Sequence, residues 1–220
     1  MLVSPVAGIV LYLIILLALI TWGSLTSTPA YGRLYLAMSL VPLMQIVTLS
    51  IAFSDLSESL AYAVVLLLLL IAVHIIVTTL DLKLRDIGLT FQHWPIQILV
   101  VLSGVALGDI GALFLEPEIS FNSLNLVIVF AFLIFAGFIE ELIFRGILQR
   151  FAIDVFGKKG VFLATILFTA LYIGWLSILG CLFVLSIGLL FGWVVKETGS
   201  IIGVGFSHGI INIIIYLAVT

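Results

Sequence analysis

Charge is the scarcest property of this sequence. Only 9% of its 220 residues are Asp, Glu, Lys or Arg, whereas 64% are hydrophobic. Soluble domains are about one quarter charged and about half apolar, so a water-soluble globular fold is excluded. We therefore expect an all-α polytopic membrane protein whose first partner is the lipid bilayer. The net charge of −3 gives no indication of a nucleic-acid partner.

Cysteine is almost absent as well. The single Cys181 excludes a disulfide framework and a cysteine-based metal site. The first residues, MLVSPVAGIVLYLIILLALITW, lack the positively charged start and the small-residue cleavage site of a secretory signal. We expect this run to be a retained first span. Because no internal repeat divides the chain, residues 1–220 are predicted to form a single transmembrane domain.

Long apolar runs are what the sequence has in abundance. A helix needs about 20 apolar residues to cross the hydrocarbon core of a bilayer. Polar or turn-forming stretches separate eight runs of about this length, which predicts an eight-helix transmembrane bundle. The predicted spans are Pro5–Trp22, Leu34–Phe53, Leu60–Thr79, Pro95–Leu115, Leu124–Phe144, Val161–Trp175, Ile178–Val195 and Ile201–Ala218. The stretch GWLSI, near Trp175, is either a loop or a kink within one longer helix.

The positions of the basic residues support eight spans. All eight lie in or beside the first, third, fifth and seventh connections, whereas the second, fourth and sixth carry no basic residue. Lys and Arg are enriched in cytoplasmic loops, so the odd-numbered connections are predicted to be cytoplasmic and both termini non-cytoplasmic. The basic residues are Arg33, Lys83, Arg85, Arg145, Arg150, Lys158, Lys159 and Lys196.

Three charged residues interrupt the end of the fifth predicted span, in the sequence FIEELIFRGILQR. Glu141 and Arg145 are four residues apart, the spacing at which helical side chains meet, so we expect an internal ion pair. Adjacent helical residues point about 100° apart, so Glu140 should face elsewhere, about one turn from the cytoplasmic end. Ionisable residues inside a membrane often mark function. Glu140 is therefore either a reactive carboxylate or, with the other two, part of a purely structural charge network.

The last predicted span carries His208 and Asn212, again four residues apart and therefore on one face. At a rise of 1.5 Å per residue, His208 lies about 10 Å inside the membrane, a depth similar to that of Glu140. An imidazole, a carboxamide and a carboxylate are thus expected to share one cavity near the inner leaflet.

These motifs occur in the order EExxxR, FxxxY and HxxxN, and together they resemble the CPBP family of intramembrane proteases (CAAX-processing and bacteriocin-processing, or Abi). The resemblance covers residues 87–213 and includes LRDIGLTF and LLFGWVVKETGSIIGVGFSHGIIN. It implies that Glu140 activates water, that His208 and Asn212 position the water or stabilise the oxyanion, and that Glu141 and Arg145 are largely structural. A membrane-tethered protein or peptide would be the substrate.

One position departs from the family pattern, because Tyr172 stands where the family usually has histidine. A phenol donates hydrogen bonds and can assist an oxyanion. It titrates near pH 10, however, which makes it a poor general base and a poor ligand for a divalent metal. Tyr172 therefore weakens the expectation of the family's usual chemistry. Whether a metal takes part stays open, and this residue makes a metal site less favoured.

Two more ionisable residues lie within the predicted spans. His74 is placed at about the level of Glu140, so it is either an accessory to the site or a residue that hydrogen-bonds a neighbouring carbonyl, the interpretation we favour. Asp109 is expected at the opposite side of the membrane, beside small residues such as Gly104, Gly108 and Gly111. Small residues allow close helix packing, so Asp109 is interpreted as structural.

The sequence leaves two functions open. The first is an intramembrane endopeptidase that cuts a peptide presented from the cytoplasmic half of the membrane. The second is a catalytically degenerate relative that serves as a binding or assembly subunit for another membrane protein. A transporter is disfavoured because the chain shows neither paired halves nor matching interrupted helices.

Overall fold

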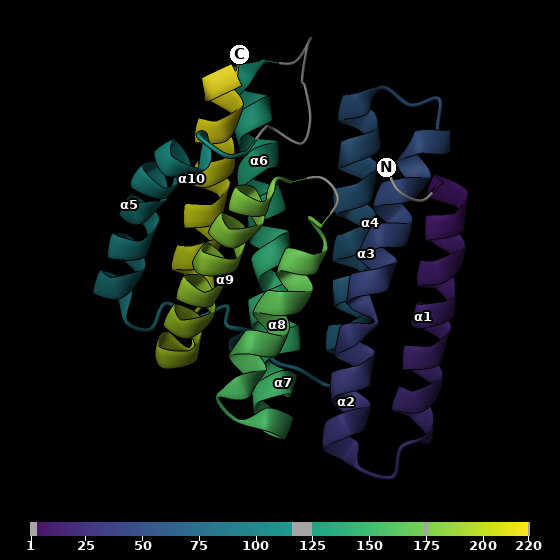
Figure 1. The fold of residues 1–220 in the computed structure, drawn as a ribbon. Helices are drawn as coiled ribbons and strands as arrows, with labels where there is room; N and C mark the ends of the chain where they lie inside the picture. The colour runs from purple at the N-terminus through teal and green to yellow at the C-terminus, as the bar shows by residue number, and fades with distance from the viewer. Residues whose placement is uncertain (1–3, 116–124, 174–175, 220) are drawn as a thin grey trace.

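The computed structural model describes residues 4–115, 125–173 and 176–219 of the chain, and these residues form helices joined by short connections (Figure 1). The helical elements are α1 (Pro5–Leu25), α2 (Pro29–Met38), α3 (Leu40–Ser50), η1 (Ile51–Phe53), α4 (Glu58–Thr79), η2 (Leu84–Ile87), α5 (Trp94–Gly111), α6 (Leu126–Glu141), η3 (Leu142–Leu148), α7 (Gln149–Phe156), α8 (Lys159–Ala170), α9 (Ile178–Thr198) and α10 (Ile202–Val219).

These elements make eight helical passes through the described part of the chain, which confirms an all-α polytopic membrane protein. Six helical segments are long and apolar enough to cross a membrane, and α8 and α10 are shorter apolar helices. With 12 residues, α8 is about 18 Å long, well short of a bilayer core of about 30 Å. The sixth pass is therefore incomplete as a helix.

Local sequence signals explain several helix boundaries. The side chains of Ser4, Asn125 and Ser177 cap the first turns of α1, α6 and α9 by accepting backbone N–H groups. Gly199 ends α9 in the left-handed conformation, with φ of 68°, which glycine adopts at little cost. The second predicted span is divided at Ser39, between α2 and α3. Pro42 explains this break, because it has no N–H to donate to the carbonyl four residues earlier.

The prediction for the fifth span was wrong at its C-terminal end. One helical segment runs from Leu126 to Phe156, with the π-helical η3 in its middle, instead of ending at Phe144. The predicted connection is reduced to a turn at Gly157, whose φ is 58°. The charge of Arg145 is matched inside the bundle by Glu141, so the helix does not have to end there. Consequently α7 continues this segment.

Other boundaries differ by smaller amounts. The sixth predicted span stops at Ala170 and α9 starts at Ile178, so the described residues Leu176 and Ser177 lie between two helices. The fourth span ends at Gly111, and Leu113 already lies in a turn. The predicted boundaries at Leu124 and Trp175 fall outside the described residues, as does the acidic connection that carries Glu116 and Glu118.

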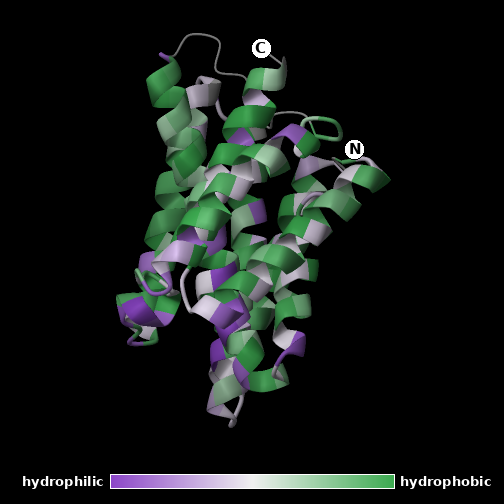
Figure 2. Ribbon diagram, turned by 90° about the vertical axis from the view of Figure 1, so that its left-hand side faces the viewer, coloured by the Kyte–Doolittle hydropathy of each residue, from purple (hydrophilic) through white to green (hydrophobic). Residues whose placement is uncertain are grey.

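The bundle has two chemically different ends. The chain termini lie at one end, called here the terminal end (Figure 1). Following the alternating direction of the passes, the connections with Arg33, Lys83 and Lys158 lie at the other, called the basic end. Hydrophilic segments gather towards this basic end (Figure 2). The structure thus shows an integral multi-pass bundle with its basic connections on one side.

Glycines bring α10 into close contact with its neighbours. A Cβ added to Gly104 of α5 would lie 2.8 Å from the carbonyl oxygen of Ser207, and one added to Gly137 of α6 would lie 2.7 Å from the backbone nitrogen of Gly209. Close helix contacts of this kind are typical of small residues in membranes. Asp109 is exposed beside this contact.

The crossing of α6 and α10 supplies a first prediction, for Gly209→Ala. A Cβ at Gly209 would lie 2.5 Å from the Cα of Ile134, so the two helices must separate. We expect a loss of about 1–3 kcal/mol in the free energy of unfolding, measured by denaturation in detergent micelles. Gly8→Ala is the matched control, because its Cβ would meet only the flexible end of Leu49, at 3.1 Å. Equal stability of the two variants would contradict the prediction.

Candidate functional site

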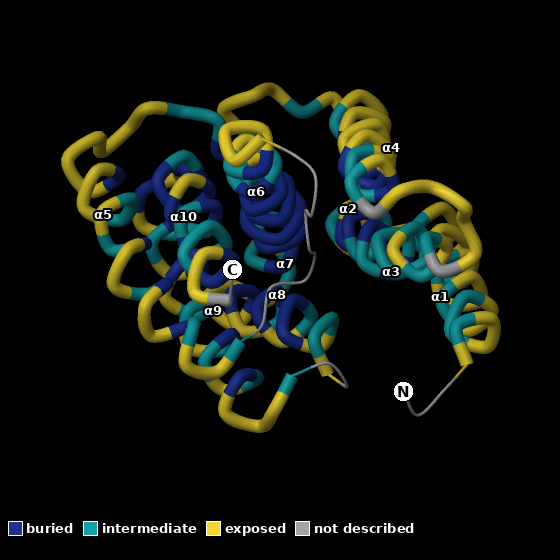
Figure 3. Tube along the Cα trace, turned by 90° about the horizontal axis from the view of Figure 1, so that it is seen from above, coloured by how far each residue is buried: buried dark blue, intermediate teal, exposed yellow. Residues whose placement is uncertain are grey.

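A central cavity of about 900 Å³ lies between α3 and α4 on one side and α6, α8, α9 and α10 on the other. Seen along the bundle, α6 carries a long buried stretch that faces this region, whereas α1 is largely exposed at the periphery (Figure 3). The cavity wall is mostly apolar. Its polar and charged members are Gln45, Thr48, Tyr62, Glu140, Glu141, Arg145, Tyr172, Ser177, His208 and Asn212.

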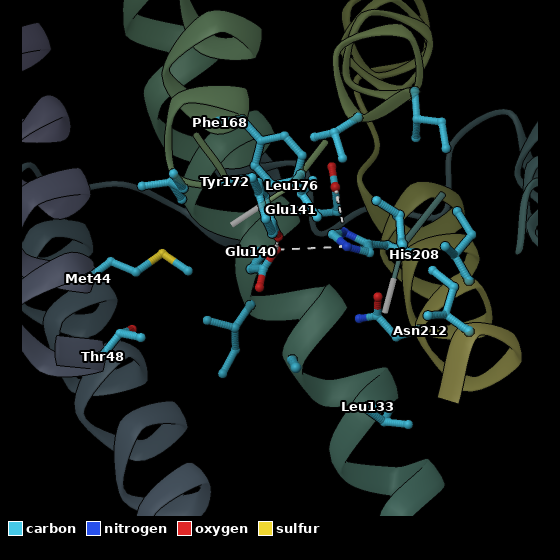
Figure 4. Close-up of a pocket in the computed structure, with 18 of the residues that line it drawn as sticks. Met44, Thr48, Leu133, Glu140, Glu141, Phe168, Tyr172, Leu176, His208 and Asn212 are labelled. Atoms are coloured by element: carbon cyan, nitrogen blue, oxygen red, sulfur yellow. Dashed lines mark hydrogen bonds and ion pairs between the residues drawn. The ribbon is translucent and has the colours of Figure 1, made fainter. Parts of the chain in front are cut away.

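Glu140 is the carboxylate that faces the cavity. Its side chain is 11% exposed, and its Oε2 lies 3.8 Å from Nε2 of His208. The hydroxyl of Tyr172 donates a hydrogen bond to the same oxygen at 3.1 Å. Tyr172 can make this contact because it lies in the turn just after α8. Figure 4 shows the three side chains converging from three separate elements.

His208 also contacts Glu141, which the sequence analysis did not anticipate. Its Nδ1 lies 2.9 Å from Oε1 of Glu141. The adjacent acids Glu140 and Glu141 face different partners, as their helical spacing predicts, but both contact this ring. The two acids do diverge, but the imidazole lies between them and offers one nitrogen to each. One side chain of α10 thus joins two successive side chains of α6.

Arg145 lies behind the acids and is completely covered. Its Nη1 is 3.1 Å from Oε1 of Glu141, and its side chain has no exposed surface. A second nitrogen, Nη2, donates to the carbonyl of Gly188 on α9 at 3.3 Å. The guanidinium also lies 4.3 Å from the centre of the Phe168 ring. The expected ion pair is therefore present, and it is fixed to two further helices.

Gln149 is a residue that the sequence analysis missed. It follows Arg145 by four residues, and its Nε2 donates to the carbonyl of Gly192 at 2.8 Å. Both acceptors are glycines on α9, also four residues apart. The sequences GLLFG on α9 and RGILQ on η3 and α7 have the same spacing of four residues, and this match could have revealed the pair of contacts. It joins α9 firmly to the helix that carries Glu140.

Of the other two predicted site residues, one lines the cavity and one does not. Asn212 lines the cavity one turn beyond His208 and lies beside it (Figure 4). His74 lies on an exposed face of α4 and is not among the lining residues. In the described part of the chain, no group of three or more His, Cys, Asp or Glu side chains has the arrangement of a metal site.

The position of Glu140 along its helix differs from the prediction. It lies near the middle of the helical segment Leu126–Phe156, not about one turn from a helix end, because that segment extends twelve residues beyond Phe144. The lining residues nearest the ends of their helices, such as Ile51, Tyr62 and Ser177, lie at the terminal end. Below Arg145, the buried side chains of Phe144 and Ile147 fill the space. The cavity therefore extends towards the terminal end.

Comparison with known families agrees with this arrangement. Residues 122–214 match the family model described as "Type II CAAX prenyl endopeptidase Rce1-like". This part of the chain belongs to the CPBP family. The matched CPBP segment contains every candidate named above except His74, and it contributes one side of the cavity. No curated protein and no solved structure gives a significant match to the chain.

CPBP membership indicates a membrane protease, a hydrolase in its general class. The CPBP match begins at residue 122, so our assignment of residues 87–121 to the same core stays a prediction. The opposite wall of the cavity, built from α3 and α4, lies outside the CPBP match altogether. The cavity is therefore closed on this side by helices that the family model does not cover.

Proposed function

We propose that the protein is an intramembrane endopeptidase in which Glu140 activates water. The observation that carries this proposal is the position of Glu140, which lines the cavity with one carboxylate oxygen facing both His208 and Tyr172. A carboxylate next to hydrogen-bond donors, in a cavity large enough for a peptide, is suited to general base catalysis. The substrate would be a membrane-tethered protein or peptide.

The proposed reaction consumes only the peptide and one water molecule. Glu140 takes a proton from water while the hydroxide oxygen bonds to the carbonyl carbon of the peptide. The carbonyl oxygen becomes an oxyanion, which accepts hydrogen bonds from His208, Asn212 and the Tyr172 hydroxyl. Such donors stabilise the developing charge strongly in a dry site. Glu140 then gives its proton to the amide nitrogen, the C–N bond breaks, and an acid and an amine are released.

The contact with Glu141 supports the role given to His208. Because Glu141 is paired with Arg145, its Oε1 is an acceptor, so Nδ1 of His208 donates to it. The ring is thereby held with Nε2 towards Glu140. Two carboxylates and one guanidinium leave one unit of negative charge, which a protonated imidazole cancels. In that state Nε2–H is the donor that the oxyanion requires.

The donor set does not fit a divalent metal. A metal would compete with the guanidinium of Arg145, which already binds Glu141. Nδ1 of His208 is also engaged by Glu141, and Tyr172 supplies a phenol in place of an imidazole. We therefore propose hydrolysis by the carboxylate and its hydrogen-bonding partners alone.

We also propose the orientation of the bundle. Basic connections favour the cytoplasmic side, so the basic end would face the cytoplasm and both termini would lie on the non-cytoplasmic side. Cysteine accessibility labelling at positions next to Lys83 and next to Pro5 would report the two sides.

The proposal is tested by cleavage with the wild type and with Tyr172→His. Purified protein in liposomes is offered a panel of single-span peptides, and mass spectrometry locates any cut. We expect the wild type to cut within an apolar segment. The variant should cut faster by about tenfold or more, because an imidazole is a better proton donor and acceptor near neutral pH than a phenol.

Tyr172→Phe provides the control, because it removes only the hydroxyl that contacts Glu140. It should be slower than the wild type. If the wild type and Tyr172→His are equally inert on every peptide, the protease proposal fails. Stable co-purification with another membrane protein would then favour an assembly subunit.

A further inference from the structure

The central cavity is almost devoid of available positive charge. Of the eight Lys and Arg residues in the chain, Arg145 is the one among the described lining residues. It is fully covered and bound to Glu141 and to the Gly188 carbonyl. The imidazole of His208, even when protonated, only balances the excess negative charge of the two carboxylates beside it, and its Nε2 faces Glu140. A substrate carboxylate would therefore find no free cation in the cavity.

The direction of the cavity adds to this effect. It extends towards the terminal end, where exposed acidic residues lie near the ends of α3 and α5. Asp55 follows η1, and Asp109 lies in the last turn of α5, both exposed. Charges of one sign repel ligands of the same sign. The acidic side chains at this end therefore add to the lack of a free cation in the cavity wall.

The walls themselves suit an uncharged chain. On α3, Met44 and Thr48 face Glu140 across the cavity (Figure 4). A peptide bond in an apolar environment needs hydrogen-bond partners, and the side chains of Gln45, Thr48 and Asn212 can provide them. Apolar substrate side chains can pack against Leu66 and Leu69 of α4.

We infer that this site, if it acts as proposed above, cuts an internal, uncharged apolar segment and discriminates against a segment that ends in a free carboxylate. A CAAX sequence stands at the C-terminus of its protein, so it brings a carboxylate close to its cysteine. The inferred substrate is therefore of a different class from the one in the name of the matching family. It would be a stretch within a membrane protein, entering from the terminal end.

Two peptides of identical apolar sequence test the inference, one ending in a carboxamide and one in a free carboxylate. Each carries a diazirine, and photo-crosslinking to the wild-type protein in nanodiscs measures binding independently of cleavage. We expect the carboxamide peptide to bind more tightly, and to be cut faster if it is cut, by about tenfold or more.

Thr48→Lys should reduce or reverse this preference, because it places a cation on the wall opposite Glu140. Thr48→Met is the matched control of similar length without charge, and it should keep the preference. Since both variants meet the same two peptides, different partitioning of the peptides into lipid cancels in the comparison.

Equal or tighter binding of the carboxylate peptide by the wild type would overturn the inference, even if the protein proves to be a protease. Absence of binding by the carboxamide peptide would overturn it too. Selective binding without cleavage by the wild type or Tyr172→His would instead leave the substrate class standing and reject the protease proposal.

Discussion

Glu140→Gln is expected to reduce peptide cleavage by about 10²- to 10⁴-fold, the usual contribution of a general base. The amide cannot accept the proton that water must lose when it attacks the peptide carbonyl. Its shape nevertheless matches the carboxylate, and its oxygen can still accept the hydroxyl of Tyr172, which lies 3.1 Å from Glu140. Cleavage rates in liposomes, with each variant at equal concentration, measure the effect.

The control for this variant is its stability. Because Glu140 belongs to the cavity wall rather than to the packed layer below it, the midpoint of unfolding should change little. If Glu140→Gln retains wild-type activity, Glu140 is not the general base and the prediction is wrong. A variant that loses both activity and fold would show that the carboxylate is structural, the other interpretation that the sequence allows.

Arg145→Met is expected to destabilise the bundle by about 3–5 kcal/mol, the usual consequence of leaving one partner of a buried ion pair unmatched. Methionine fills much of the same volume and adapts to its surroundings. The loss therefore comes mainly from the uncompensated charge of Glu141 and from the hydrogen bond to Gly188. Denaturation of the protein in micelles measures it.

The double variant Glu141→Gln with Arg145→Met separates charge from packing. It removes both charges, so it should be more stable than Arg145→Met alone even though it carries one more substitution. Such non-additivity is the mark of two residues in direct contact. If the effects of the two single substitutions simply add, the pair does not interact energetically and the prediction is wrong.

Much of this arrangement follows from short sequence spacings. The interval of four residues between Glu141 and Arg145 predicts their contact. The small residues of α5 predict close helix packing, and the structure shows that the partner is α10. The distribution of Lys and Arg predicts eight passes and a bundle with its basic connections at one end. Each of these signals is local or is repeated along the chain, which is why sequence alone carries it.

The remaining features depend on contacts between distant segments. No local pattern shows that the ring of His208 inserts between the two acids, or that the phenol of Tyr172 donates to Glu140. The continuation of α6 to Phe156 was hidden because Arg145 looks like the end of a span until its partners are known. Likewise, the sequence of α3, LVPLMQIVTLS, does not show which of its faces turns Thr48 towards the cavity.

The two hydrogen bonds from Arg145 and Gln149 to glycine carbonyls of α9 have a mechanical consequence. They are spaced one helical turn apart, so together they oppose both rotation and sliding of α9 against the long central segment. On the facing side, α3 reaches across through Gln45, whose Nε2 lies 3.5 Å from the carbonyl oxygen of Leu171. The cavity is thus bounded by α9, which is held at two points, and by α3, which is held across it by one longer contact. We therefore expect a bulky substrate to displace α3 rather than α9.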